Sequence, residues 1–137
     1  MRVWDRVEIL EGRLREDSRG RLHVALGASQ LPPDATFGEM YVVFSEAPGD
    51  RRGDHRHVEA DEWFTVVEGR ATLELRDPRT GDRREIELDA AMPCTVRVPA
   101  GLAHCLVNRG PGRMIATAWS SREYDPLDTL TDRTDRP

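Results

Sequence analysis

Residues 71 to 98 read ATLELRDPRTGDRREIELDAAMPCTVRV, and this stretch decides the fold. Three runs within it, at 71–76, 85–88 and 95–98, alternate apolar with polar side chains. A period of two puts the apolar side chains of an extended strand on one face, so each run predicts a half-buried β-strand. Residues 77–82 combine proline, glycine and aspartate between the first two runs, and we predict a hairpin loop there.

The rest of the chain continues this pattern. Runs rich in β-branched and aromatic residues occur at 22–26, 40–44 and 63–67, and apolar runs follow at 104–107 and 114–119. No long amphipathic helix is indicated. For 137 residues we expect one all-β domain of about eight to ten strands, folded as an antiparallel sandwich or barrel. We place its core at about 40–120, N-terminal strands at 3–26, and a polar tail at 125–137.

The composition excludes several kinds of chemistry. All 20 basic residues are arginine, which rules out a Schiff-base lysine, a P-loop lysine and a lysine base. The net charge of −5 argues against a nucleic-acid surface. Cys94 and Cys105 form no CxxC pair, and we expect reduced, buried, structural thiols. Because no apolar leader or membrane-length apolar stretch is present, we predict a cytoplasmic protein that does not bind membranes.

Three of the four histidines fall in two short segments. His55 and His57 are two residues apart, so on a strand both side chains project from the same face. Glu62 follows a turn at the head of the next apolar run, and His104 follows the tight turn that begins at Pro99. Three imidazoles and one carboxylate that converge inside a barrel would form a divalent metal site for Zn, Fe, Mn, Ni or Co.

The two segments resemble the paired motifs of the cupin superfamily. They read Gly49-x5-His55-x-His57-x4-Glu62-x6-Gly69 and Pro99-x-Gly101-x2-His104-x3-Asn108. One position departs from the family pattern, because Pro93 stands where a glycine is usual six residues before the proline of the second motif. The resemblance implies a single-domain jelly-roll β-barrel, in agreement with the strand pattern.

The flanking residues are similar to the nucleotide-sugar epimerase and ketoisomerase cupins. The 3,5-epimerases of dTDP-4-keto-6-deoxyhexoses have an early Arg-Gly pair, as at Arg19, and an Arg-Gly-x-His at the catalytic histidine, as at Arg52. The dTDP-4-keto-6-deoxyglucose 3,4-ketoisomerases share His-x-His. The metal-containing C-terminal cupin domain of a capsular polysaccharide epimerase looks nearer still, because it also shares the glutamate and a late aromatic-Asp-Pro like that at Tyr124.

This resemblance implies an isomerase that acts on a nucleotide-diphospho 4-keto-6-deoxysugar by removing a proton next to the ketone, in deoxysugar or polysaccharide biosynthesis. It also implies a homodimer, with the N-terminal strands possible elements of exchange. The residues expected to form the site are the catalytic candidates His55, His57, Tyr41 and Tyr124, the substrate-binding Arg19, Arg51 and Arg52, and the metal ligands His55, His57, Glu62 and His104. Zinc is our first choice of metal.

Several alternatives stay open at this point. The full tetrad also suits a metal-dependent cupin dioxygenase, and a non-catalytic sugar-binding cupin would use the tetrad as a structural element. If a metal occupies all three imidazoles, Tyr41, Tyr124 or a metal-bound hydroxide must move the proton. If it does not, His55 or His57 is the base. The sequence names neither the sugar and its nucleotide nor the choice among C3 epimerisation, C5 epimerisation and ketoisomerisation.

Overall fold

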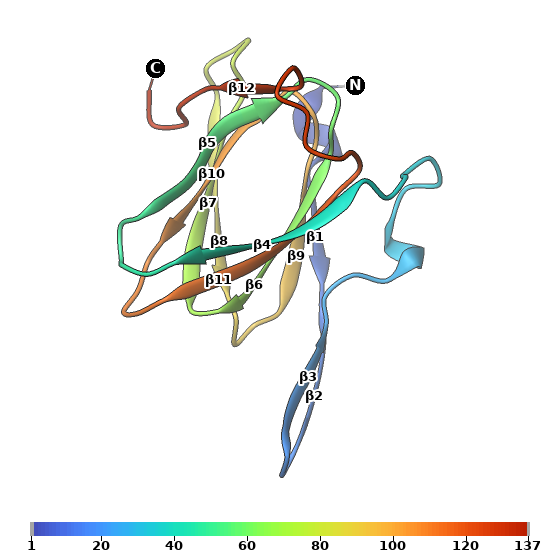
Figure 1. Cartoon of the computed structure of the whole chain (residues 1–137), viewed down its shortest axis with the longest axis vertical. Helices are drawn as coiled ribbons and strands as arrows, with labels where there is room; N and C mark the ends of the chain where they lie inside the picture. Colours follow the sequence, from blue (N-terminus) through green and yellow to red (C-terminus); the bar gives the residue numbers. More distant parts are fainter. Residues whose placement is uncertain (1, 137) are drawn as a thin grey trace.

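Two five-stranded antiparallel sheets face each other in the computed structural model, which describes residues 2–136 (Figure 1). The first sheet has the order β1 (Glu8–Glu11), β9 (Cys94–Val98), β6 (Glu62–Glu68), β11 (Met114–Ser120) and β4 (Glu39–Ser45). The second has the order β12 (Thr129–Thr131), β5 (Arg51–His57), β10 (Ala103–Asn108), β7 (Arg70–Arg76) and β8 (Arg83–Asp89). This arrangement confirms the predicted jelly roll.

The stretch from 71 to 98 forms the strands that its alternation predicts. β7 and β8 pair as an antiparallel hairpin, with Leu73 opposite Ile86, and the Asp77 amide donates to the Asp82 carbonyl at 2.9 Å to close the loop. The chain then crosses to the other sheet, where β9 pairs with both β1 and β6. One continuous stretch thus supplies an edge of one sheet and an inner strand of the other.

The core fills the space between the two sheets. Its members are the inward-facing residues of the alternating strands, and most expose 2% of their surface or less. Burying each large aliphatic side chain contributes roughly 1.5–3 kcal/mol, so this layer supplies much of the stability. The largest buried apolar side chains are Trp63, Leu73, Leu75, Leu88, Leu102, Leu106, Met114, Val96 and Val98.

The chain differs from expectation at its first residues. Val3–Arg6 forms a 3₁₀ turn (η1) and not a strand, and β1 begins at Glu8 and pairs with β9. Exchange of the N-terminal strands with a second copy stays a prediction. The tail contributes β12, whose Thr129 and Thr131 lie opposite His57 and His55, so the tail belongs to the second sheet as far as residue 131. Strands β1, β2 and β12 are too short or too polar for their alternation to stand out in the sequence.

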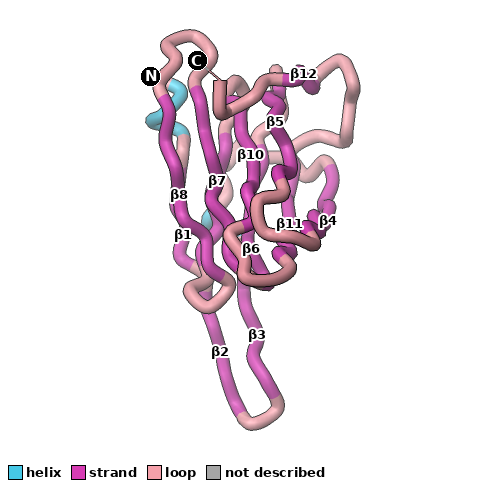
Figure 2. Tube along the Cα trace, turned by 90° about the vertical axis from the view of Figure 1, so that its left-hand side faces the viewer, coloured by secondary structure: helices cyan, strands magenta, loops and turns pink. Residues whose placement is uncertain are grey.

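A two-stranded ribbon projects from the body (Figures 1 and 2). It consists of β2 (Arg13–Asp17) and β3 (Gly20–Val24), which pair only with each other. The chain returns from the ribbon through a short 3₁₀ turn, η2 (Ala28–Gln30), to β4. Within residues 2–136, no helix has the length and apolar character needed to span a membrane. Cys94 and Cys105 are free thiols, and Cys105 is fully buried.

Candidate active site

An irregular stretch of β5 aims His55 and His57 into the interior. Gly53 and Asp54 both have positive φ, at 127° and 57°, where β10 shifts register between His104 and Cys105. A side chain at position 53 would place its Cβ 2.8 Å from the His104 carbonyl oxygen, so only glycine fits here without displacing β10. The bulge brings His55 directly opposite His104.

The turn between His57 and Glu62 is held by Asp128. Asp128, on the tail, accepts hydrogen bonds from the amides of Glu59 at 2.7 Å and Ala60 at 3.3 Å. Its own carbonyl accepts from the Val58 amide at 2.9 Å. These bonds fix the path of the chain from His57 to Glu62, the first residue of β6.

The third histidine follows a turn that requires glycine. Gly101 has φ 97°, and its amide donates to the His57 carbonyl at 2.8 Å, which ties this turn to the end of β5. His104 Nδ1 lies 3.3 Å from the Leu102 carbonyl. Because a carbonyl only accepts, Nδ1 carries the proton and the neutral ring has its lone pair on Nε2. Nε2 is buried and has no hydrogen-bond partner within residues 2–136.

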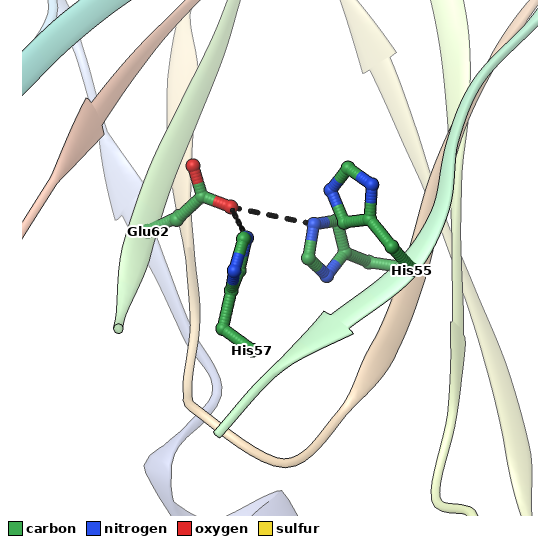
Figure 3. A group of neighbouring side chains, drawn as sticks. His55, His57 and Glu62 are labelled. Carbon is green, nitrogen blue, oxygen red and sulfur yellow. Dashed lines mark hydrogen bonds and ion pairs between the residues drawn. The ribbon is translucent and has the colours of Figure 1, made fainter. Parts of the chain in front are cut away.

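The four predicted ligands converge. Figure 3 shows His57 and Glu62 pointing toward one another, with His55 beside them on β5. His57 Nε2 lies 2.6 Å and His104 Nε2 3.4 Å from Glu62 Oε1. One nitrogen or oxygen from each of the four side chains lies within 4.8 Å of the others. The sequence therefore predicted the cluster correctly, and the unpartnered His104 lone pair beside a carboxylate suits a divalent cation.

The cluster is buried, and burial separates the pKa values of its members. Burial lowers the pKa of His55 to about 4, with help from His104 and His57, so this ring is neutral at pH 7. Burial also lowers the pKa of His57, but the hydrogen bond and charge of Glu62 outweigh it and leave that pKa raised. For Glu62, burial raises the pKa, while the adjacent His104 and His57 rings outweigh burial and lower it overall.

A cavity of about 440 Å³ opens onto the cluster. Tyr41, Tyr124, His55 and His57 line it. The Tyr41 hydroxyl donates to Glu62 Oε2, while burial first, and then the Glu62 charge, raise the pKa of Tyr41. The rim is acidic, and its only arginine within residues 2–136, Arg122, pairs with Glu59 at 2.5 Å. The carboxylates in the lining are Glu39, Glu62, Glu123, Asp125 and Asp128.

The three predicted arginines lie in three different places. Arg52 lines a smaller cavity of about 130 Å³ together with His55 and His104, and it has no ion pair within residues 2–136. Arg51 lines neither of these two cavities, because its guanidinium binds Asp54 at 2.9 Å and Glu74 at 2.8 Å. The expectation that Arg51 contacts substrate is therefore not supported by its position.

Arg19 lies at the far tip of the ribbon, beside Asp17, to which it is 2.6 Å distant. Figure 1 shows this tip at the opposite end of the molecule from β12 and the histidine end of β5. A single chain therefore does not bring Arg19 to the cluster.

Sequence reasoning missed the residues of the tail that support His57. Thr129 Oγ1 lies 3.3 Å and an Asp128 oxygen 3.7 Å from His57 Nδ1, the ring nitrogen that faces away from Glu62. The aromatic-Asp-Pro at Tyr124 pointed to this segment, but no spacing in the sequence relates position 128 to position 57. Only the pairing of β12 with β5 makes these residues neighbours.

A profile of one protein family, the polysaccharide biosynthesis C-terminal domain, matches residues 15–132. The chain belongs to this family. The match includes most of the ribbon, the cluster and β12, and it begins after β1. No curated protein sequence is significantly similar to this polysaccharide biosynthesis C-terminal domain.

Solved structures share the fold of this polysaccharide biosynthesis C-terminal domain at low sequence identity. A dTDP-sugar isomerase from Desulfovibrio desulfuricans is 20% identical with a TM-score of 0.83, over 97% of this chain and 87% of that one. The 3,4-ketoisomerase QdtA from Thermoanaerobacterium thermosaccharolyticum, in complex with TDP-4-keto-6-deoxyglucose, is 17% identical with a TM-score of 0.77, over 92% and 87%. The capsular polysaccharide assembling protein CapF from Staphylococcus aureus is 24% identical with a TM-score of 0.67, over 89% of this chain and 34% of CapF. At this identity, the likeness shows that the domain shares the fold of these proteins.

Proposed function

We propose that this domain is an isomerase that acts on a nucleotide-diphospho 4-keto-6-deoxysugar, as an epimerase or a ketoisomerase, in deoxysugar or polysaccharide biosynthesis. The observation that carries the proposal is the convergence of three imidazoles and a buried carboxylate on the wall of a 440 Å³ cavity. The family and the activities named for the similar structures agree with it.

A ketone at C4 makes the hydrogens on C3 and C5 acidic, because the carbanion that forms delocalises into the carbonyl. Catalysis therefore needs a base beside the C–H bond, a group that stabilises the developing enolate oxygen, and a proton source for return. Return of the proton to the same carbon, on its opposite face, gives an epimer. Return of the proton to C4 of the C3–C4 enediol gives the 3-keto isomer.

His55 is the group best suited to be the base. Its ring lines both cavities, it is neutral at pH 7, and no side chain within residues 2–136 hydrogen-bonds it. The other two rings are engaged, His57 with Glu62 and His104 with the Leu102 carbonyl. Tyr124, across the cavity, has a hydroxyl available to return the proton.

A divalent metal, with zinc the first choice, fits the remaining three donors, His57, Glu62 and His104. The buried, unpartnered Nε2 of His104 is the observation that supports this assignment. A bound cation would supply Lewis acidity toward the ketone oxygen. The chain's own part is to hold these donors in place, through the Leu102 carbonyl behind His104 and Thr129 behind His57.

The diphosphate needs cations that the acidic rim of the large cavity does not provide. Arg52 is the one predicted arginine that lies near the cluster without an ion-pair partner in the described chain. Its planar guanidinium suits a phosphate, which it binds through two parallel hydrogen bonds.

We also propose a homodimer in which the ribbon packs on a second copy. An isolated two-stranded ribbon is only marginally stable in water, and this one exposes Leu22 while it carries four arginines against two acids. The edge strand β4 exposes Met40, Val42 and Phe44 on its outer side. Packing the ribbon of a second copy on β4 would bury these apolar side chains and stabilise both the ribbon and the edge strand. The same packing would bring Arg19 of each ribbon toward the acidic cavity of the other copy.

Product analysis tests the proposed activity. The protein is incubated with dTDP-4-keto-6-deoxyglucose, and the nucleotide sugar is identified by chromatography and proton NMR. We expect a C3 or C5 epimer, or the 3-keto isomer, without oxygen consumption. Because three histidines and a glutamate also suit iron, oxygen uptake is measured in parallel on iron-loaded protein. Oxygen uptake without isomer formation would replace the proposal with the dioxygenase.

A further inference from the structure

The two oxygens of the Glu62 carboxylate have different neighbours. Oε1 faces the imidazoles, 2.6 Å from His57 Nε2 and 3.4 Å from His104 Nε2. Oε2 accepts a short hydrogen bond from the Tyr41 hydroxyl. The Glu62 side chain is only 2% exposed, so water does not compete for either oxygen. Tyr41 and the imidazoles thus lie on opposite sides of one carboxylate.

Tyr41 is held firmly enough to fix this geometry. It lies on the inward face of β4, and its backbone is opposite Ala118 of β11, which in turn pairs with Phe64 of β6. Its ring packs against the hydrophobic core. Three adjacent strands therefore set the distance between the Tyr41 hydroxyl and Glu62, which begins β6.

We propose that Tyr41 is a positioning residue that occupies Oε2 of Glu62 and so presents Oε1 alone to the metal between His57 and His104. This inference rests on the metal site of the proposed function. Without the Tyr41 hydroxyl, Oε2 would lose its hydrogen bond, and the carboxylate could offer either oxygen, or both, to the metal. Hydrogen bonds from the protein to a ligating carboxylate orient it, and their loss lowers metal affinity about 10–100-fold.

The test measures metal binding, not turnover. Zn²⁺ affinity is determined by competition with a chromophoric chelator for the wild-type protein, Tyr41→Phe, Glu62→Gln and the double variant. Tyr124→Phe is the matched control, because this tyrosine lines the same cavity with 70% of its surface exposed. Tyr41→Phe keeps the ring that packs against the core, and circular dichroism and thermal melting verify that each variant is folded.

We expect Tyr41→Phe to weaken Zn²⁺ binding about 10–100-fold, and Tyr124→Phe to leave it unchanged. In the Glu62→Gln background, loss of the Tyr41 hydroxyl should have no further effect, because it acts through Glu62. The visible spectrum of the Co²⁺-loaded protein should also change in Tyr41→Phe, as the carboxylate alters its binding mode.

Three results separate the claims. Wild-type affinity in Tyr41→Phe overturns the positioning role and leaves the metal site standing. The positioning role is also overturned if Tyr41→Phe lowers Zn²⁺ affinity equally in the wild-type protein and in Glu62→Gln, because Tyr41 would then act by another route. If the wild-type protein binds neither Zn²⁺ nor Co²⁺, the metal assignment of the proposed function fails and Tyr41 has no metal ligand to position.

Discussion

Gly53 lies where the requirements of the fold and of the site coincide. Its φ of 127° is a conformation that other residues rarely adopt, and holding an alanine there costs about 1–3 kcal/mol. An alanine Cβ would also lie 2.8 Å from the His104 carbonyl oxygen and 3.1 Å from Cys105 Cα, both backbone atoms of β10. Relieving that contact by moving β10 costs about 1–3 kcal/mol more. Gly53→Ala should therefore lose about 2–6 kcal/mol of unfolding free energy.

Gly49→Ala provides the matched control. This glycine also has positive φ, at 89°, in the turn before β5, but a Cβ there would meet nothing within 4 Å. It should lose only about 1–2 kcal/mol. The contact with β10, which carries His104, accounts for most of the difference between the two variants. Gly53→Ala should therefore also weaken Zn²⁺ binding, whereas Gly49→Ala should not.

Urea unfolding followed by tryptophan fluorescence measures both free energies, and chelator competition measures the metal affinity. Equal stability of the two variants would refute the argument that β5 and β10 approach too closely for a side chain. A destabilised Gly53→Ala with unchanged metal affinity would refute the link from that contact to the position of His104.

Three further predictions concern charge, ligands and assembly. Burial raises the pKa of Asp54, but the Arg51 ion pair and the Thr134 amide outweigh burial and lower this pKa to about 2. Because this value is below that of an unfolded aspartate, ionised Asp54 stabilises the fold above about pH 4, and this contribution is lost as pH falls toward 2. Asp54→Asn should remove about 2 kcal/mol of this acid-dependent stability, measured as the wild-type minus variant difference in urea unfolding from pH 6 to pH 2; a constant difference contradicts the assignment. His104→Ala should abolish Zn²⁺ binding while His55→Ala retains it, as measured by metal analysis after dialysis, and equal loss in both would make His55 a ligand. Replacing residues 13–24 by a short glycine-serine turn should convert a dimer to a monomer in light scattering, and an unchanged mass would exclude the ribbon from the interface.

Most of the fold follows from local sequence. The runs that form β7, β8 and β9 alternate in sequence, and periodicity detects them. β6 and β10 are buried along nearly their whole length, and their continuous apolar character indicates them instead. The ribbon and β12 lack a buried face in this sense, since β2 is nearly all exposed and β12 has two exposed residues of three. β2 pairs with the next strand, β3, whereas β12 pairs with β5, a partner far away in the sequence that a local pattern does not record.

The cluster was predictable for a different reason. Three of the chain's four histidines, His55, His57 and His104, stand with Glu62 at the spacings of two known motifs, and those motifs place the four side chains together. The supporting groups have no such signature. Asp128 is one of many aspartates in the chain, and it becomes special only because β12 pairs with β5. Arg52 stands in the Arg-Gly-x-His segment and lines a cavity, whereas no sequence signal shows that Arg51 is held in ion pairs with Asp54 and Glu74.

An enzyme with the proposed activity exchanges a proton next to the ketone of a nucleotide-linked 4-keto sugar. Proton NMR of dTDP-4-keto-6-deoxyglucose, incubated with the protein in D₂O, detects this exchange. We expect the C3 or C5 proton signal to disappear as deuterium enters, and the position of the lost signal identifies the reacting carbon. His55→Ala should be folded but inactive. Retention of both signals in the presence of zinc-loaded wild-type protein would contradict the claim.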